Sequence, residues 1–538
     1  MSDTPLVSIT AAEWNETRAR HLLNRAGFGV PAVRAAELAR MEPATAVASL
    51  LDYASIPQEL TEPDFLLTPQ IVQKRRDAWK DFPEDERRRL QAELQQEERQ
   101  AIQRLKAWWI RRMTTTPRPL EEKMTLFWHG HFATSAQKVR SSASTYQLNR
   151  LFREHATGNL KQLTIAVGQS HSMLAYLDNN KNVRGKPNEN WARELMELFT
   201  LGQGQYTEED IKESARAFTG WTFRGDGFAF DESRHDFGPK TFLGRTGNFD
   251  GWDIIDIVFD QPAAAEFIST KLWRYFAGAE PSPELTQALA TVLRENDYEL
   301  EPFLRTIFFS QAFYADEVAG SQIKSPAQFV VQLAHDLRLE SLPAATMAQA
   351  TARLGQDLFY PPNVKGWDGG RDWINANTLL SRYNMPAGFI RTTNETKASE
   401  GESAAGMDMA PPMKKPDMPV KERLRARIET LSPQERASVR KRLREAPTKR
   451  ERRALATEVL DGQKDTAARW SPERMAEGLA FVDSESFVRD LAQRLLVAPL
   501  QPDRIRVLAE AVGPGRPDTA RLKAALHLLL SSAEYQLC

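Results

Sequence analysis

Residues 186–221 read KPNENWARELMELFTLGQGQYTEEDIKESARAFTGW, and this stretch is the best guide to the fold. Asn188 can cap a helix that Gly202 ends, because helices commonly begin after an amide side chain and stop at a glycine. Thr207 and Asp210 stand three residues apart, which is the spacing of a capping box. A second helix therefore follows directly, and the stretch predicts a helix–loop–helix unit.

The first helix of this unit has one apolar and one polar face. The apolar face, which we expect to be buried, follows spacings of four and three: Trp191, Leu195 and Leu198. Asn190, Glu194 and Glu197 share the other face by the same spacing, so two carboxylates and an amide are aligned. The polar face is therefore a candidate for acid–base chemistry. The alternative is a solvated face whose carboxylates pair with Arg193 and Arg216.

Helical periodicity dominates the rest of the chain. The charged segment Pro83–Met113 predicts a long helix, Thr114–Pro119 breaks it, and Leu120–Trp128 predicts an apolar helix that folds back as an αα-hairpin. Only residues 221–242 alternate aromatic and polar residues around a Gly-Asp-Gly turn, which predicts a β-hairpin. We therefore predict a mainly α fold: a multi-helical single large core with a small β-hairpin element and a charged helical insertion.

Composition divides the chain into four parts. Residues 1–393 have the pattern of the helical core, which includes the hairpin near 221–242. Residues 394–419 lack aromatic side chains and predict a flexible linker. Residues 420–470 are rich in Lys and Arg, so we predict a basic helical insertion, with the binding of an acidic partner as an alternative role. Residues 471–538 predict C-terminal helices that return to the core.

Overall composition excludes several classes of protein. The 538 residues have a formal net charge of −1, and the basic segment lacks interleaved aromatic residues, so we predict no nucleic-acid partner. One cysteine, Cys538, excludes an intramolecular disulfide and a thiolate metal cluster. No apolar run approaches the roughly 18 residues of a membrane span. Residues 1–15 show no export signal, so we expect a cytoplasmic location.

Three histidines are candidate metal ligands. His129 and His131 lie in WHGHF, where they can share an ion only if Gly130 breaks the helix, because residues two apart on a helix point in opposite directions. His235 follows the predicted hairpin. Imidazole with carboxylate suits zinc, manganese or iron, so a divalent transition metal is the predicted cofactor. The alternative is that these histidines are hydrogen-bonded core or turn residues.

Six strings occur together in a known family. They are HLLNRAGFG, FWHGHF, NENWARELMELFTLGQGQYTEEDIKESARAFTGW, GPKTFLGRTGNFDG, KSPAQFVV and YPPNVKGWDGG. The chain resembles the bacterial family called domain of unknown function 1800, over residues 19–384 and again near the C-terminus. Many members of that family carry an export leader and are encoded beside a sulfatase-like exported protein. The resemblance therefore implies an envelope or periplasmic role, reached through a partner with its own signal, and a complex with such a protein.

The shared strings direct the choice of functional residues, because they contain or adjoin all the candidates. The predicted metal ligands are His129, His131, Glu194 and His235. The predicted catalytic residues are Glu197 as general base, with Arg193 and Lys240 to neutralise an anionic substrate group. The leading hypothesis is a metal- or carboxylate-dependent, hydrolase-like enzyme that acts on an envelope or polysaccharide substrate. The alternative is a non-catalytic scaffold for the sulfatase-like protein, which requires only a broad interface.

Overall fold

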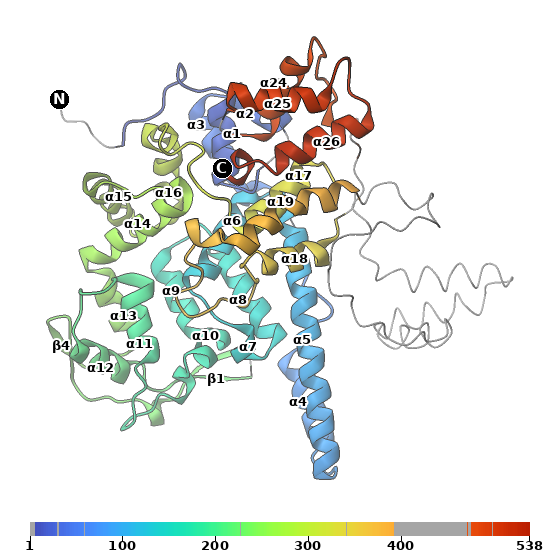
Figure 1. Cartoon of the computed structure of the whole chain (residues 1–538). Coiled ribbons are helices and arrows are strands. Elements are labelled where there is room, and N and C mark those ends of the chain that lie inside the picture. The colour runs from blue at the N-terminus through green and yellow to red at the C-terminus, as the bar shows by residue number, and fades with distance from the viewer. Residues whose placement is uncertain are drawn as a thin grey trace.

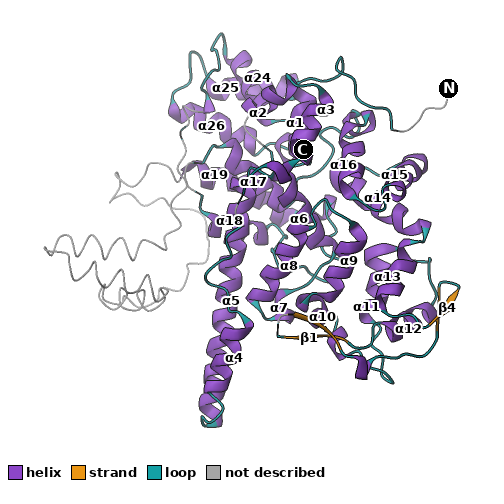
Figure 2. Cartoon of the chain, turned by 180° about the vertical axis from the view of Figure 1, so that it is seen from behind, coloured by secondary structure: helices purple, strands orange, loops and turns teal. Residues whose placement is uncertain are grey.

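A computed structural model describes residues 6–29, 32–58, 60–225, 227–339, 342–391, 471, 475–497 and 499–538. The predicted linker and basic insertion lie outside the described residues. The described part is mainly α, as predicted, with two short antiparallel ribbons at one edge (Figures 1 and 2). Among the described residues, no helix combines the length and the apolar character that spanning a bilayer requires.

The elements follow one another in this order. The helices up to the first strand are α1 (Glu16–Arg25), α2 (Ala32–Ala39), α3 (Pro43–Leu51), α4 (Pro69–Ala78), α5 (Glu84–Thr115), α6 (Pro119–His131), α7 (Ala136–Val139), α8 (Ser142–Glu154), α9 (Leu160–Gln169), α10 (His171–Tyr176), η2 (Asn179–Lys181), α11 (Asn190–Glu194), η3 (Leu195–Thr200) and α12 (Glu208–Ala217). The strands are β1 (Trp221–Arg224), β2 (Gly227–Phe230), β3 (Lys240–Phe242) and β4 (Arg245–Gly247). The later helices are α13 (Gly251–Phe259), α14 (Pro262–Ala277), α15 (Pro283–Glu295), α16 (Leu300–Phe309), α17 (Pro326–Asp336), α18 (Ala344–Arg353), η6 (Gly370–Trp373), α19 (Ala376–Arg391), α24 (Ser484–Leu495), α25 (Pro502–Val512) and α26 (Thr519–Leu530).

Several local predictions are confirmed. The long helix predicted over 83–113 is α5, and the break after it leads directly into α6. The predicted hairpin is β1–β2, with Trp221 paired to Phe230. A second ribbon, β3–β4, escaped prediction because its three-residue strands are too short to show alternation. The capping box at Thr207 and Asp210 opens α12.

Helix α6 lies between two apolar clusters. One cluster is built from α1–α3, α6 and α8–α16, and the other from α5, α17–α19 and α24–α26. Leu120 and Trp128 of α6 belong to the first cluster, whereas Leu126 belongs to the second. Residues 120–129 are therefore all buried, and α6 is the axis around which the other helices pack (Figure 1). The C-terminal helices α24–α26 lie beside α1–α3 in the same view.

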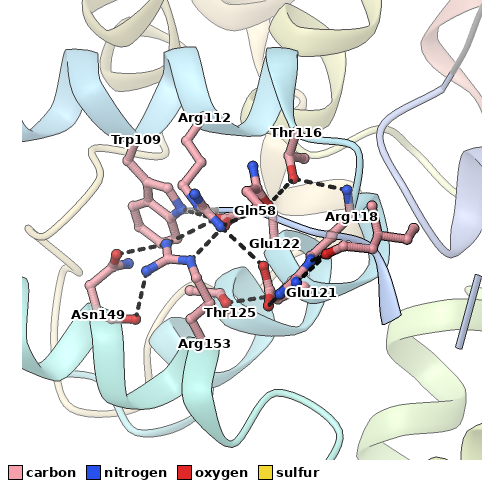
Figure 3. Close-up of polar contacts among 11 residues, drawn as sticks. Gln58, Trp109, Arg112, Thr116, Arg118, Glu121, Glu122, Thr125, Asn149 and Arg153 are labelled. Atoms are coloured by element: carbon pink, nitrogen blue, oxygen red, sulfur yellow. Dashed lines mark hydrogen bonds and ion pairs between the residues drawn. The ribbon is translucent and has the colours of Figure 1, made fainter. Parts of the chain in front are cut away.

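Two of the residues buried with α6 are carboxylates, and arginines from neighbouring helices neutralise them (Figure 3). Glu122 accepts hydrogen bonds from Arg153 Nε at 2.6 Å and Nη2 at 2.9 Å, and it also pairs with Arg112. Glu121 pairs with Arg112 at 3.0 Å and with Arg118 at 3.1 Å. A buried charge is tolerated only when it is paired and hydrogen-bonded, so this network fixes α5, α6 and α8 relative to one another.

One element projects from the body. Helix α4 has no buried residue, and the first buried residue of α5 is Leu94, although that helix begins at Glu84. In both overall views α4 and the outer part of α5 form an arm that extends beyond the end of the body where α7, α10 and β1 lie (Figures 1 and 2). Ile71 and Phe82 are exposed on this arm.

Candidate functional site

The predicted polar helix of the 186–221 stretch is present, but its second half is a π-helix. The Oδ1 atom of Asn188 accepts the N–H of Asn190, so the helix starts where the sequence indicated. Helix α11 ends at Glu194 and η3 continues it as a π-helix, a form that occurs mainly as single turns, often at functional sites. The wider turn shifts the buried face. Leu198, which α-helical spacing predicted to be buried, is only half-buried, whereas Phe199 is buried.

Side chains from two distant helices hold the carbonyls at the end of η3. His131 Nε2 of α6 donates to the Phe199 carbonyl at 3.0 Å. Lys271 Nζ of α14 donates to the Leu198 carbonyl at 3.1 Å, and burial lowers the pKa of this lysine to about 8. These carbonyls lie in the last turn of η3, where backbone carbonyls have no partner within the helix. The two donors thereby stabilise the segment that carries Glu197.

Glu194 and Glu197 form a half-buried pair of carboxylates. Burial raises the pKa of Glu194 above its usual value, and the negative charge of Glu197 raises it further. Glu197 accepts a hydrogen bond from Gln203 Nε2 at 2.7 Å, and Tyr206 Oη lies 3.5 Å from its other oxygen. The sequence prediction that these two carboxylates share a face is confirmed. A raised pKa on one member of such a pair favours a division into a proton donor and a proton acceptor.

Two further groups act electrostatically on Glu194. Lys365, in the loop before η6, is exposed, and its positive charge opposes the rise in the pKa of Glu194. Tyr176 at the end of α10 is half-buried, and its pKa is raised by burial and by the charge of Glu194. Tyr176 lies outside the six strings, and Lys365 lies within YPPNVKGWDGG but was not a predicted site residue. Only the fold brings them to Glu194, which lies more than 15 positions away from each along the chain.

Arg193 is engaged in ion pairs, and its positive charge also opposes the rise in the pKa of Glu194. Its guanidinium contacts both oxygens of Glu208 at 2.9 Å and one oxygen of Glu189 at 3.2 Å. The hydrogen bonds that Arg193 donates to Glu208 are the main reason that the pKa of Arg193 is raised. This residue joins α11 to α12, so its contacts are structural.

The two histidines of the WHGHF string point to different partners. The expected break at Gly130 is wrong, because α6 continues through it to His131. His129 Nε2 accepts the N–H of Phe359 at 3.0 Å, and burial lowers the pKa of His129 to about 3. This ring is therefore neutral, with Nδ1 carrying its proton. His131, as described above, binds the π-helix. Residues two apart on a continuous helix cannot meet at one ion.

His235 and Lys240 lie together near the ribbons and are both buried. His235 Nδ1 is 2.8 Å from the carbonyl of Thr219. Lys240 Nζ donates to the carbonyls of Asp236 at 2.6 Å and Gly238 at 3.1 Å, and burial lowers its pKa. Both side chains stabilise the turn between β2 and β3.

The four predicted metal ligands are therefore not gathered at one point. Among the residues that the structure describes, no group of three or more His, Cys, Asp or Glu side chains is arranged to hold a metal ion. What the fold brings together instead is the carboxylate pair with Tyr176, Tyr206 and Lys365.

A family model supplies the classification of the chain. The model of DUF1800, described as a protein of unknown function, matches residues 21–537. The chain belongs to this family. No curated protein and no solved structure matches the DUF1800 chain significantly.

Three of the strings that resemble the DUF1800 family meet around the π-helix. His131 of FWHGHF binds Phe199 of the string that contains η3. Gly366 of YPPNVKGWDGG has a φ of +83°, and a Cβ atom there would lie 2.1 Å from the carbonyl oxygen of Gly130. Only glycine allows this approach, and it places the loop that carries Lys365 against α6.

Proposed function

We propose that this DUF1800 protein is a carboxylate-dependent hydrolase that cleaves a polysaccharide of the cell envelope. Glu194, whose raised pKa favours the protonated form, acts as general acid and protonates the oxygen of the leaving sugar. Glu197 acts as general base, takes a proton from water and directs the hydroxyl group to the anomeric carbon. Hydrolysis of a glycosidic bond commonly uses such a pair of carboxylates.

The observation that carries this proposal is the environment of the pair. Two carboxylates three residues apart share one half-buried face, with a π-helix beside them and a tyrosine near each. Perturbed titratable groups of this kind are concentrated at functional sites. The predicted metal does not enter this mechanism, because the three histidines are bonded separately to backbone groups.

The test is an assay of hydrolysis on a panel of polysaccharides, in which the release of reducing ends is measured. The substrates are chitin, xylan, polygalacturonate and peptidoglycan. We expect wild type to cleave at least one of them, and Glu194→Gln and Glu197→Gln each to lose about 10²-fold or more of that activity. Glu209→Gln, on the exposed face of α12, is the matched control and should retain it. Wild-type rates in both site variants would overturn the proposal.

A second function, partner binding, is favoured by the projecting arm. Helix α4 has no buried residue, yet the arm exposes Ile71 and Phe82, each 41% accessible. We propose this arm as the contact for a sulfatase-like exported protein. Titration of the two purified proteins should show binding that weakens about tenfold in Ile71→Ser/Phe82→Ser. Unchanged affinity in this variant would exclude the arm as the contact.

A further inference from the structure

A group of positively charged side chains comes from segments near the helix that carries the carboxylate pair. We call it the cationic surface, and its members are Lys138, Lys181, Arg184, Lys186 and Lys365. All five are exposed, and they come from α7, from η2 and the segment after it, and from the loop before η6. Figures 1 and 2 show α7 and α10 at the same end of the body.

Contacts through Tyr176 and Asn190 connect this surface to Glu194. Lys138 Nζ lies 5.6 Å from the centre of the Tyr176 ring, and the phenol of Tyr176 interacts with the charge of Glu194. Asn190, on the same helix as Glu194, donates from Nδ2 to the carbonyl of Leu177, the residue after Tyr176. The surface therefore begins next to the carboxylates.

Two of these cations form salt bridges with the same carboxylate. Lys138 and Lys181 both pair with Asp178, at 2.8 Å and 2.6 Å. Asp178 has a φ of +58°, and its backbone carbonyl accepts from Asn188 Nδ2 at 3.3 Å, so the position of this carboxylate is set by the fold. Two lysines share one negative charge, which leaves a net positive charge at this point.

The other three cations form no salt bridge with a described residue. Within the described part of the chain, no carboxylate lies within salt-bridge distance of Arg184, Lys186 or Lys365. Their backbone is held in place: Arg184 donates its N–H to the Arg234 carbonyl at 2.8 Å, and Lys186 forms a bridge with Val183. The positive charge of Lys365 acts on Glu194, so this cation is close to the carboxylate pair.

We propose that the cationic surface binds the acidic groups of an anionic polysaccharide and positions its chain across Glu194 and Glu197. This inference rests on the proposed hydrolase function and names its class of substrate. Exposed cations attract a substrate that has negative charges spaced along its chain. When those charges bind the cationic surface, the neutral glycosidic bond lies beside the acid Glu194 and the base Glu197. Carboxylate and sulfate groups on sugars share this chemistry.

The experiment measures binding separately from cleavage. Full-length Glu194→Gln, which should bind but not turn over, is titrated with polygalacturonate, dextran sulfate, neutral dextran and single-stranded DNA. We expect affinity for one of the two acidic polysaccharides to exceed that for dextran and for DNA, and to fall with salt. The comparison of polygalacturonate with dextran sulfate identifies the acidic group.

A matched set of variants assigns the binding to this surface. Arg184→Gln/Lys186→Gln/Lys365→Gln should weaken binding of the acidic polysaccharide about tenfold, as expected for three exposed charge contacts. Arg353→Gln/Arg489→Gln/Arg516→Gln removes the same charge from exposed positions on other elements and should leave binding unchanged.

Each outcome decides the proposal. Equal weakening in both triple variants, equal affinity for dextran, or tighter binding of DNA would overturn it. Selective loss of binding in the first triple variant, together with no cleavage by wild type, would support the cationic surface and would refute the hydrolase.

Discussion

Two pairs of carboxylates on described helices lie in different environments. Glu121 and Glu122 of α6 are buried among three arginines, whereas Glu194 and Glu197 are half-buried. Burial opposes ionisation of Glu122, but the charges and hydrogen bonds of Arg153 and Arg112 outweigh it and lower its pKa. Burial and Glu197 raise the pKa of Glu194. Burial and the charge of Glu122 also raise the pKa of Glu121, so a raised pKa occurs in both pairs. What distinguishes the buried pair is that arginines form salt bridges with both of its carboxylates.

The largest expected effect is at the buried pair. Glu122→Ala should reduce the free energy of unfolding by about 3–5 kcal/mol, because it leaves Arg153 and Arg112 as buried charges without their partner. Denaturant unfolding measures the change, with Glu154→Ala, an exposed residue paired to Arg150, as control. Because the pKa of Glu122 is lowered in the folded state, its stabilisation is present above its unfolded pKa and is lost as pH falls below that value. A loss under 1 kcal/mol at pH 7 would show that the network is not structural.

The next largest effect is expected at Gly366, and it tests whether Glu194 and Glu197 depend on the loop that carries Lys365. Gly366→Ala should cost about 2 kcal/mol, because a Cβ atom at φ +83° meets the Gly130 carbonyl, and it should also lower hydrolysis by moving Lys365. Gly370→Ala is the matched control, since it has φ +56° but open space around it. Thermal unfolding and hydrolysis are measured on both. Equal losses in the two variants would mean that backbone strain alone, and not the contact with α6, is important.

Substitution of Glu194 should have a smaller effect on the free energy of unfolding, in the opposite direction to that of Glu122→Ala. Glu194→Gln should increase the free energy of unfolding at pH 7 by on the order of 0.5 kcal/mol, a figure reduced for its partial exposure, while it removes activity. The pKa of Glu194 is raised on folding, so its ionised form destabilises the fold as pH rises from the unfolded pKa through the folded one. The gain should therefore vanish at low pH in denaturant titrations. Destabilisation at pH 7 would place Glu194 with the structural pair.

The smallest effect concerns the pH dependence of hydrolysis. With Glu194 as general acid, kcat/KM should fall as pH rises through its raised pKa. Lys365→Gln removes a positive charge that opposes this rise, so the alkaline limb of the profile should move to higher pH. The profile is measured on a neutral oligosaccharide, so that loss of substrate attraction does not contribute. A shift in the other direction would contradict the assignment of Glu194.

Local features were predictable because neighbouring residues determine them. The capping box at Thr207 and Asp210, the long helix α5 and the β1–β2 hairpin follow from spacing and turn residues alone. The alignment of Glu194 with Glu197 was predicted for the same reason. The unusual cluster EEK at 121–123, inside an apolar helix, was a signal of buried ion pairs that sequence reasoning did not use.

Other features depended on contacts between distant parts of the chain. Spacing cannot distinguish an α-helix from a π-helix whose carbonyls are held by His131 and Lys271, so the burial of Leu198 was mispredicted. It also could not show that Gly130 stays helical. For His129, only the fold supplies the N–H of Phe359, 230 positions away, which makes this ring a hydrogen-bond acceptor in the core.

By itself the sequence determined the helical class, the family and the residue types at the polar face, because periodicity and capping act over a few residues. The tertiary structure decided which carboxylates form salt bridges with arginines and which histidines form hydrogen bonds with backbone groups. It also placed Lys365 and Tyr176 beside Glu194. Burial and the charge of distant residues set these properties, and neither is encoded within one helical turn.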